Sequence, residues 1–211
     1  MAEELVLRDG TRAIVWSLLP SDREALVDGF EQLSPESRRL RFLSPVVHLS
    51  ESMLEHLVDD VDGVDHVALV IFVENGDSFD PVGIGRIVRY REAPEAADLA
   101  VTVSDDWQGR GVASALLPAL VARRPAGVTH IITEVAADNP ASLAMLRRLG
   151  PTTVEDTGMG VYGVDVDLTG VGEPLAPAGT TTGRMHPVLA PELEERRREL
   201  RSRDAVCPWL Q

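Results

Sequence analysis

The stretch VSDDWQGRGVASALL (residues 103–117) joins a β-branched strand pattern to an Ala/Leu-rich helix pattern, with two acids, a Trp and two glycines between them. The glycines leave the backbone N–H groups of residues 109–113 free of side-chain crowding. These groups are the unpaired donors at the start of a helix, where the helix dipole is also positive. The junction therefore predicts a cradle for a phosphate or pyrophosphate.

Three kinds of phosphate-binding loop compete for this assignment. A Walker A loop requires a Lys, and the chain has 20 Arg and no Lys. A Rossmann fingerprint places G-x-G-x-x-G after the first strand, whereas this junction follows the fourth predicted strand and lacks the last Gly. The third pattern is Q/R-x-x-G-x-G/A, and QGRGVA (108–113) matches it position by position. A glycine-rich turn that only caps a helix remains the alternative.

Hydrophobic periodicity around the junction predicts a mixed α/β layer. Ser21 with Glu24 forms a capping-box pattern, and Ser34 and Ser50 are further N-caps. Turn residues at 75–81 predict a hairpin, and two late strand–helix–strand crossovers predict a parallel part of the sheet. Strands are expected at 11–19, 65–74, 82–91, 98–103, 128–135, 152–157 and 160–168, and helices at 21–32, 34–42, 50–61, 111–123 and 139–150.

Composition excludes several classes of protein. The formal net charge of −14 disfavours nonspecific binding to nucleic acid and favours cationic partners. No run of 18 apolar residues could span a membrane, and the acidic N-terminus lacks the apolar core of a signal peptide, so a cytoplasmic location is the default expectation. The single Cys207 excludes an internal disulfide framework. No metal site is expected, because the five histidines (48, 56, 66, 130 and 186) are scattered.

A second block strengthens the case for the cradle. NPASLAMLRRLG (139–150) follows the glycine loop with one predicted strand between them. The two blocks together resemble the acyl-CoA-binding motifs of the Gcn5-related N-acetyltransferase (GNAT) superfamily. The resemblance implies a mixed, mostly antiparallel sheet with helices on both faces, in which two parallel strands splay apart beside the pantetheine arm. It also implies acetyl-CoA as co-substrate and no metal.

Further stretches resemble the acetyltransferase domain of bacterial Pat-type protein-lysine acetyltransferases. They are LRDGTR (7–12), LSPESRRLRF (33–42), HVALV (66–70) and ADLAVTV (97–103), so the resemblance covers roughly residues 5–168. It implies a site with two groups of residues. Those expected to bind the co-substrate are Val101, Thr102, Val103, Gln108, Gly109, Arg110, Gly111, Val112, Ala113, Asn139 and Ser142.

Catalysis is expected to depend on Asp98, which stands where the Pat-type domain carries a Glu as general base, with Glu134 as the second candidate. Two departures from the family bear on this assignment. Asp98 is one methylene shorter than Glu, and the family's frequent Tyr in the second helix falls at Leu146. The expected activity is direct transfer of an acetyl group from CoA to a primary amine, on a small molecule or a protein lysine. The alternative is a non-catalytic acyl-CoA-binding or sensing module.

The composition changes after Gly170, which predicts a domain over 1–170 and an appendage over 171–211. GVGEPLAPAGTTTG (170–183) has the composition of a linker, and PELEERRRELRSR (191–203) that of a charged helix. The last residues include Val206, Trp209 and Leu210. Our hypothesis is that this apolar end docks either on its own domain or on a second subunit. In the second case the protein is a homodimer. A solvated tail is the alternative.

Overall fold

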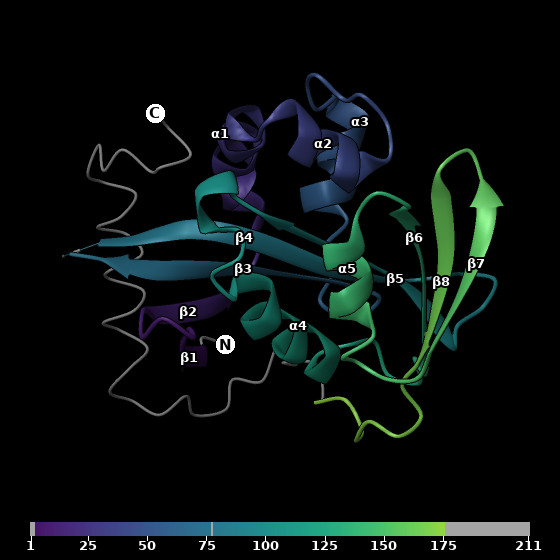
Figure 1. The fold of residues 1–211 in the computed structure, drawn as a ribbon. Coiled ribbons are helices and arrows are strands. Elements are labelled where there is room, and N and C mark those ends of the chain that lie inside the picture. The colour runs from purple at the N-terminus through teal and green to yellow at the C-terminus, as the bar shows by residue number, and fades with distance from the viewer. Residues whose placement is uncertain (1–2, 77, 176–211) are drawn as a thin grey trace.

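A computed structural model describes residues 3–76 and 78–175, and one mixed sheet runs through them (Figure 1). The order of its eight strands is β1-β2-β3-β4-β5-β6-β8-β7. The strands are β1 (Glu3–Val6), β2 (Arg12–Ser17), β3 (His66–Asn75), β4 (Ser78–Arg89), β5 (Ala96–Val103), β6 (His130–Ala136), β7 (Thr152–Gly158) and β8 (Val161–Asp167).

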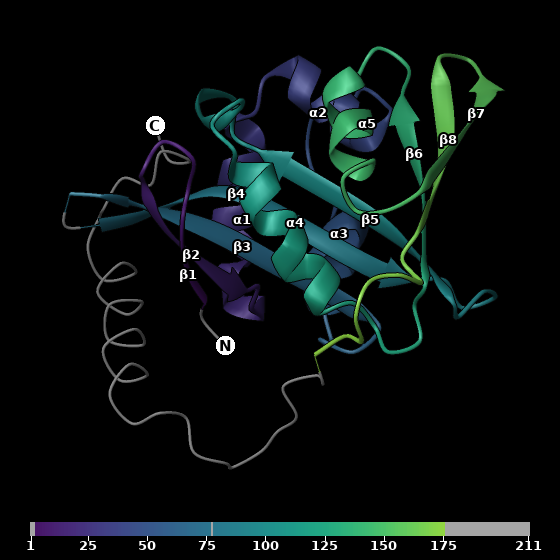
Figure 2. The same cartoon turned by 60° about the horizontal axis from the view of Figure 1, so that its bottom comes forward.

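Helices cover both faces of this sheet (Figures 1 and 2). One face carries α1 (Arg23–Gln32), α2 (Pro35–Phe42) and α3 (Glu51–Leu54), and α3 continues into a π-helical turn, Glu55–Asp59. The other face carries α4 (Val112–Ala122) and α5 (Pro140–Leu146). Each face has its own apolar cluster, and the larger one lies under α4 and α5. The predicted mixed α/β fold with helices on both faces is confirmed.

The parallel part of the sheet is smaller than the two crossovers predicted. Among the strands of the described ranges, only β5 and β6 pair in parallel, through Ala96↔His130 and Ala97↔Ile131. The second crossover also brings β7 back in the direction of β6, but β8 inserts between them and pairs antiparallel with both. The crossover pattern gives the direction of a strand, but not which strand will come to lie beside it.

Local differences from the predicted elements have local causes. The helix begins later than the S-D-R-E pattern predicts, because a 3₁₀ turn over Pro20–Asp22 precedes α1, whose N-cap residue is Asp22, and the Asp22 carboxylate accepts the Leu19 N–H. Strand β1 was not predicted. The β3–β4 turn is shorter than predicted, since β4 already begins at Ser78. The caps at Ser34 and Ser50 are confirmed, because each hydroxyl accepts a backbone N–H three residues on.

The described chain continues past the predicted boundary at Gly170. The Leu175 N–H donates to the Ala122 carbonyl at the end of α4, and the Arg124 guanidinium donates to the carbonyls of Val171 and Gly172. Residues 171–175 therefore pack on the domain. The predicted charged helix and the apolar end at 206–210 lie outside the described residues.

Glycine in β4 sets how closely α4 approaches the sheet. A Cβ at Gly85 would lie 2.3 Å from Leu120 Cδ1 and 3.2 Å from Leu116 Cδ2, both on the buried side of α4. Interiors are close-packed, so this contact cannot absorb another methyl group without movement.

We predict that Gly85→Ala lowers the free energy of unfolding by about 1–3 kcal/mol, the usual cost of overpacking a core. Urea titration followed by circular dichroism measures this change. Gly170→Ala is the control, because a Cβ there meets nothing within 4 Å. Equal stability of the two variants would contradict the proposed close contact of α4 with β4.

Candidate functional site

The junction between β5 and α4 is a turn with two left-handed residues. After the 3₁₀ turn Asp105–Trp107, Gly109 has φ +74° and Gly111, the N-cap of α4, has φ +94°. L-residues with side chains rarely adopt such angles, so the glycines are needed to turn the chain into the helix. No side chain caps the first turn of α4. Its N–H groups are therefore available to an external anion.

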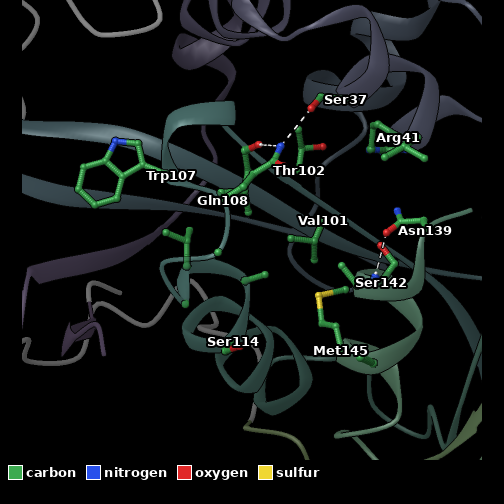
Figure 3. Close-up of a pocket in the computed structure, with 18 of the residues that line it drawn as sticks. Ser37, Arg41, Val101, Thr102, Trp107, Gln108, Ser114, Asn139, Ser142 and Met145 are labelled. Carbon is green, nitrogen blue, oxygen red and sulfur yellow. Dashed lines mark hydrogen bonds between the residues drawn. The ribbon is translucent and has the colours of Figure 1, made fainter. Parts of the chain in front are cut away.

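A cavity of about 430 Å³ lies in front of these N–H groups (Figure 3). Most of the lining residues come from the glycine turn and from α2, α4, α5 and β5, and two others lie in the β1–β2 loop and just after α5. Of the residues expected to bind a co-substrate, those that line the cavity are Val101, Thr102, Val103, Gln108, Gly109, Gly111, Val112, Ala113, Asn139 and Ser142. The structure thus gathers residues 101–113 and 139–142 around one space, as the two sequence blocks predict.

The Arg110 side chain is the exception among the expected binding residues. Its Nε and Nη2 donate to Asp9 Oδ2 at 3.0 and 2.7 Å, and its guanidinium carbon lies 3.7 Å from the centre of the Trp107 ring. Hydrogen bonds from Thr11, and then from Arg110, lower the pKa of Asp9 to about 2. Arg110 is therefore held away from the cavity and fixes the turn against the β1–β2 loop.

Gln108 and Asn139 line the cavity but also hold its walls. Gln108 Nε2 donates to Ser37 Oγ at 3.0 Å and to the Val103 carbonyl at 3.2 Å, which ties the turn to α2 and β5 (Figure 3). The Asn139 side chain accepts the Ser142 N–H at 3.1 Å and so caps α5. Asn139 therefore both caps α5 and lines the cavity.

The strands beside the cavity separate after two paired residues. The β5–β6 pairing ends at Ala97↔Ile131, and farther along the Thr133 hydroxyl donates to the Leu99 carbonyl at 3.2 Å. The Leu99 and Val103 carbonyls both accept from side chains on the side away from β4. Because backbone direction alternates along a strand, the Val101 N–H points to that same side, into the space left by the separation.

Neither expected catalytic carboxylate lines the large cavity. Asp98 and Glu134 lie on the sheet face that carries α1–α3, on opposite sides of the gap between β5 and β6. Asp98 is half-buried and Glu134 is exposed. Between them the Tyr90 hydroxyl donates to the Ile132 carbonyl at 2.9 Å. Partial burial, and then the charges of Asp98 and Glu134, raise the pKa of Tyr90.

Sequence reasoning missed five polar residues that line the cavity: Arg8, Ser37, Arg41, Ser114 and Arg148. Arg8 and Arg148 place positive charge beside the start of α4, and Arg148 also donates to Ser114 Oγ at 3.2 Å. Because Arg8, Ser37, Arg41 and Arg148 lie far from the glycine turn along the chain, the sequence alone did not indicate that they line the cavity.

In the described ranges, no cluster of three potential metal ligands is found. No helix among these residues is long and apolar enough to cross a membrane.

Comparison with known proteins decides the family. The family model "Acetyltransferase (GNAT) family" matches residues 33–150, more than half of the chain, and spans the glycine turn and α5. The chain belongs to the GNAT family. The fold agrees with this assignment, because its mostly antiparallel sheet contains one parallel pair at the site.

Three similar proteins show how much of this chain the likeness covers. Acetyltransferase Pat of Mycolicibacterium smegmatis is 35% identical over 163 residues, which are 76% of this chain and 47% of that protein. The chain thus spans about half the length of this curated relative. The GNAT domain of S. lividans PAT is 31% identical with a TM-score of 0.68, covering 79% of this chain and 97% of that domain. The protein yncA of Salmonella typhimurium, solved with its cofactor acetyl-CoA, shares the fold at 16% identity and a TM-score of 0.56, covering 78% and 98% of the two chains.

The turn is also held to α2 by a carboxylate. Asp105 accepts the Ser34 N–H, the Ser34 hydroxyl and the Ser37 hydroxyl at 2.9, 2.8 and 2.6 Å. Partial burial would raise the pKa of Asp105, but hydrogen bonds from Ser37 and Ser34 outweigh it and hold the pKa below its ordinary value of 3.8.

The lowered pKa of Asp105 predicts an acid-sensitive contact between the turn and α2. Because the folded form binds the proton more weakly than the unfolded form, the stabilisation is complete above the unfolded pKa of 3.8 and is lost as the pH falls through the folded pKa. We expect Asp105→Asn to have a lower melting temperature than the wild type at pH 7 and a smaller difference below pH 3.8. Asp106→Asn is the neighbouring control. A constant difference across pH would refute this account.

Proposed function

We propose that the chain is an acetyl-CoA-dependent N-acetyltransferase. The observation that carries the proposal is the first turn of α4, whose N–H groups face a cavity that continues to the separation of β5 from β6. The N–H groups of the turn suit a pyrophosphate, and Arg8 and Arg148 add positive charge on the same wall. The part of the cavity between β5 and α5, beside Val101 and Asn139, suits an extended pantetheine arm.

When bound, acetyl-CoA supplies an acetyl thioester to the amine of the acceptor. The Val101 N–H, which points into the gap, is placed to donate to the thioester oxygen and to stabilise the charge that develops there. An ammonium ion cannot attack a carbonyl carbon, so a base must remove its proton. We assign this role to Asp98, with Glu134 on the opposite side of the gap as the second candidate. The short Asp98 side chain reaches the amine directly or through a water.

The acceptor is a primary amine, and we favour a protein lysine. Two features support this choice. The first is the similarity to relatives of the Pat type. The second is the sheet face around the gap, which carries Asp98, Glu134 and, across β8, Glu155 on one side of the β-sheet. A face of this charge attracts a cationic acceptor. The location that suits this activity is the cytoplasm, where acetyl-CoA is made and used.

A non-catalytic acyl-CoA-binding module is the second candidate, and Leu146 motivates it. Leu146, which stands at the family's frequent Tyr, is 2% exposed and belongs to the core rather than to the cavity. Neither of the two tyrosines, Tyr90 and Tyr162, lines the cavity in its place. Neither tyrosine therefore places a hydroxyl in the cavity to protonate the leaving thiolate.

We predict that Asp98→Asn lowers kcat by about 10²–10⁴-fold, the usual loss for a general base, while acetyl-CoA affinity stays within about twofold. Release of free CoA thiol from acetyl-CoA measures turnover with lysine peptides, polyamines and other amines, and calorimetry measures affinity. Glu134→Gln is the matched variant. A large loss in Glu134→Gln with near wild-type turnover in Asp98→Asn would reverse the assignment. Acetyl-CoA binding without turnover on any amine would establish the binding module instead.

A further inference from the structure

A second, smaller cavity of about 40 Å³ adjoins the site on the face of α1 and α2. It shares Arg41 and Thr102 with the large cavity, and Ala100 of β5 also borders it. The rest of its wall is apolar, apart from Arg86 of β4. The small cavity therefore adjoins the strand beside which the thioester is proposed to lie, and its polar lining includes two guanidinium groups.

Arg86 is a buried cation whose donors are only partly used. Its side chain is 5% exposed, and Nη1 donates to the Leu57 carbonyl at 3.1 Å and to His66 Nε2 at 3.2 Å. Within the described residues, its Nε and Nη2 make no further hydrogen bond. Burial and then the charge of Arg86 lower the pKa of His66 to about 4, so this histidine is neutral at physiological pH and adds no charge.

Arg41 brings a second cation to the same cavity. Its guanidinium lies 4.8 Å from the centre of the Phe42 ring, and neither Arg41 nor Arg86 forms an ion pair within 3–76 and 78–175. Burial lowers the pKa of Arg41, and burial and then Arg41 lower the pKa of Arg86 to about 9. Asp98 offsets part of both effects at longer range. Two positive charges thus face one carboxylate, which leaves one positive charge without a counter-ion.

The size of the cavity indicates what can supply the missing negative charge. A volume of about 40 Å³ holds on the order of three water-sized groups, since one requires about 10–15 Å³. A single carboxylate has three heavy atoms and accepts hydrogen bonds from a guanidinium in its favoured planar geometry. We propose that Arg41 and Arg86 form a subsite for a carboxylate carried by the acyl group, so that the protein uses a short dicarboxylic acyl-CoA, such as malonyl-CoA, in preference to neutral acyl groups of the same size.

This inference rests on the proposed function and leaves its chemistry unchanged. The amine nitrogen forms a bond to the thioester carbon, the carbon–sulfur bond breaks, and the sulfur leaves with the electron pair of that bond. The acceptor ammonium gives up one proton to the base before the attack and a second after the carbon–nitrogen bond has formed; the CoA sulfur takes up one proton, and the other passes to solvent. The distal carboxylate of the acyl group keeps its atoms and its charge throughout, and serves only in binding.

The test compares two acyl-CoA molecules whose acyl groups have the same heavy-atom skeleton. Isovaleryl-CoA replaces the two carboxylate oxygens of malonyl-CoA with methyl groups. Calorimetry with the full chain should give a Kd for malonyl-CoA about tenfold to a hundredfold lower than for isovaleryl-CoA, as charge-assisted hydrogen bonds predict. Arg41→Met should reduce this ratio at least tenfold. Arg12→Met, which removes an equal charge from a surface pair with Glu74, should leave the ratio unchanged.

Each outcome has a distinct meaning. Acetyl-CoA binding with equal or weaker binding of malonyl-CoA than of isovaleryl-CoA overturns the subsite and leaves the proposed function intact. Failure of every acyl-CoA to bind overturns the proposed function and the subsite with it. Arg86 is part of the core, so the test depends on Arg41, which lies on the cavity-facing side of α2. If Arg41→Met instead reduces acetyl transfer only to amines that carry a carboxylate, the anion belongs to the acceptor and the proposal is wrong.

Discussion

The separation of β5 from β6 after Ala97 is the constraint on which the site depends. Two residue pairs hold β5 and β6 side by side. Beyond them the Thr133 hydroxyl donates a hydrogen bond to the Leu99 carbonyl, where a continuous sheet would have a backbone hydrogen bond. The backbone N–H of Val101 is thereby left without a strand partner on that side. The same separation makes room for α5 and its cap Asn139, which faces β5 across the cavity (Figure 3). A continuous sheet would fill this space with backbone hydrogen bonds.

Charge is distributed unevenly around this gap. The chain as a whole carries a net charge of −14, yet the cavity wall contains Arg8, Arg41 and Arg148. Arg8 and Arg148 lie beside the start of α4, whereas Asp98 and Glu134 lie at the sides of the gap on the sheet face that carries α2 and Arg41. A polyanionic co-substrate and a cationic acceptor can therefore approach from different sides and meet at β5. The ion pair of Arg110 with Asp9 has a structural role, because it holds the turn that positions α4.

The sequence predicted the parts of the site that are continuous in the chain. QGRGVA and NPAS form short junctions at the starts of helices, and their glycine, proline and asparagine preferences are local properties. It did not predict Arg8, Ser37, Arg41 or Arg148, because they come from different elements and meet only in three dimensions. The motif also predicted that Arg110 binds phosphate, whereas its side chain contacts Asp9 and Trp107 in the structure. The insertion of β8 between β6 and β7 likewise depends on tertiary pairing.

The central claim is that the turn before α4 holds the acyl-CoA phosphates, and acetyl-CoA affinity of Gly111→Val tests it most directly. Gly127→Val is the matched control, because Gly127 also has a positive φ, +84°, but lies outside the cavity. Both variants should lose stability, since valine is strained at such angles. The account predicts that folded Gly111→Val binds acetyl-CoA at least about tenfold more weakly, while Gly127→Val binds it as the wild type does, because the added side chain covers the N–H groups that receive the phosphates. Equal affinity of the two variants would contradict the assignment.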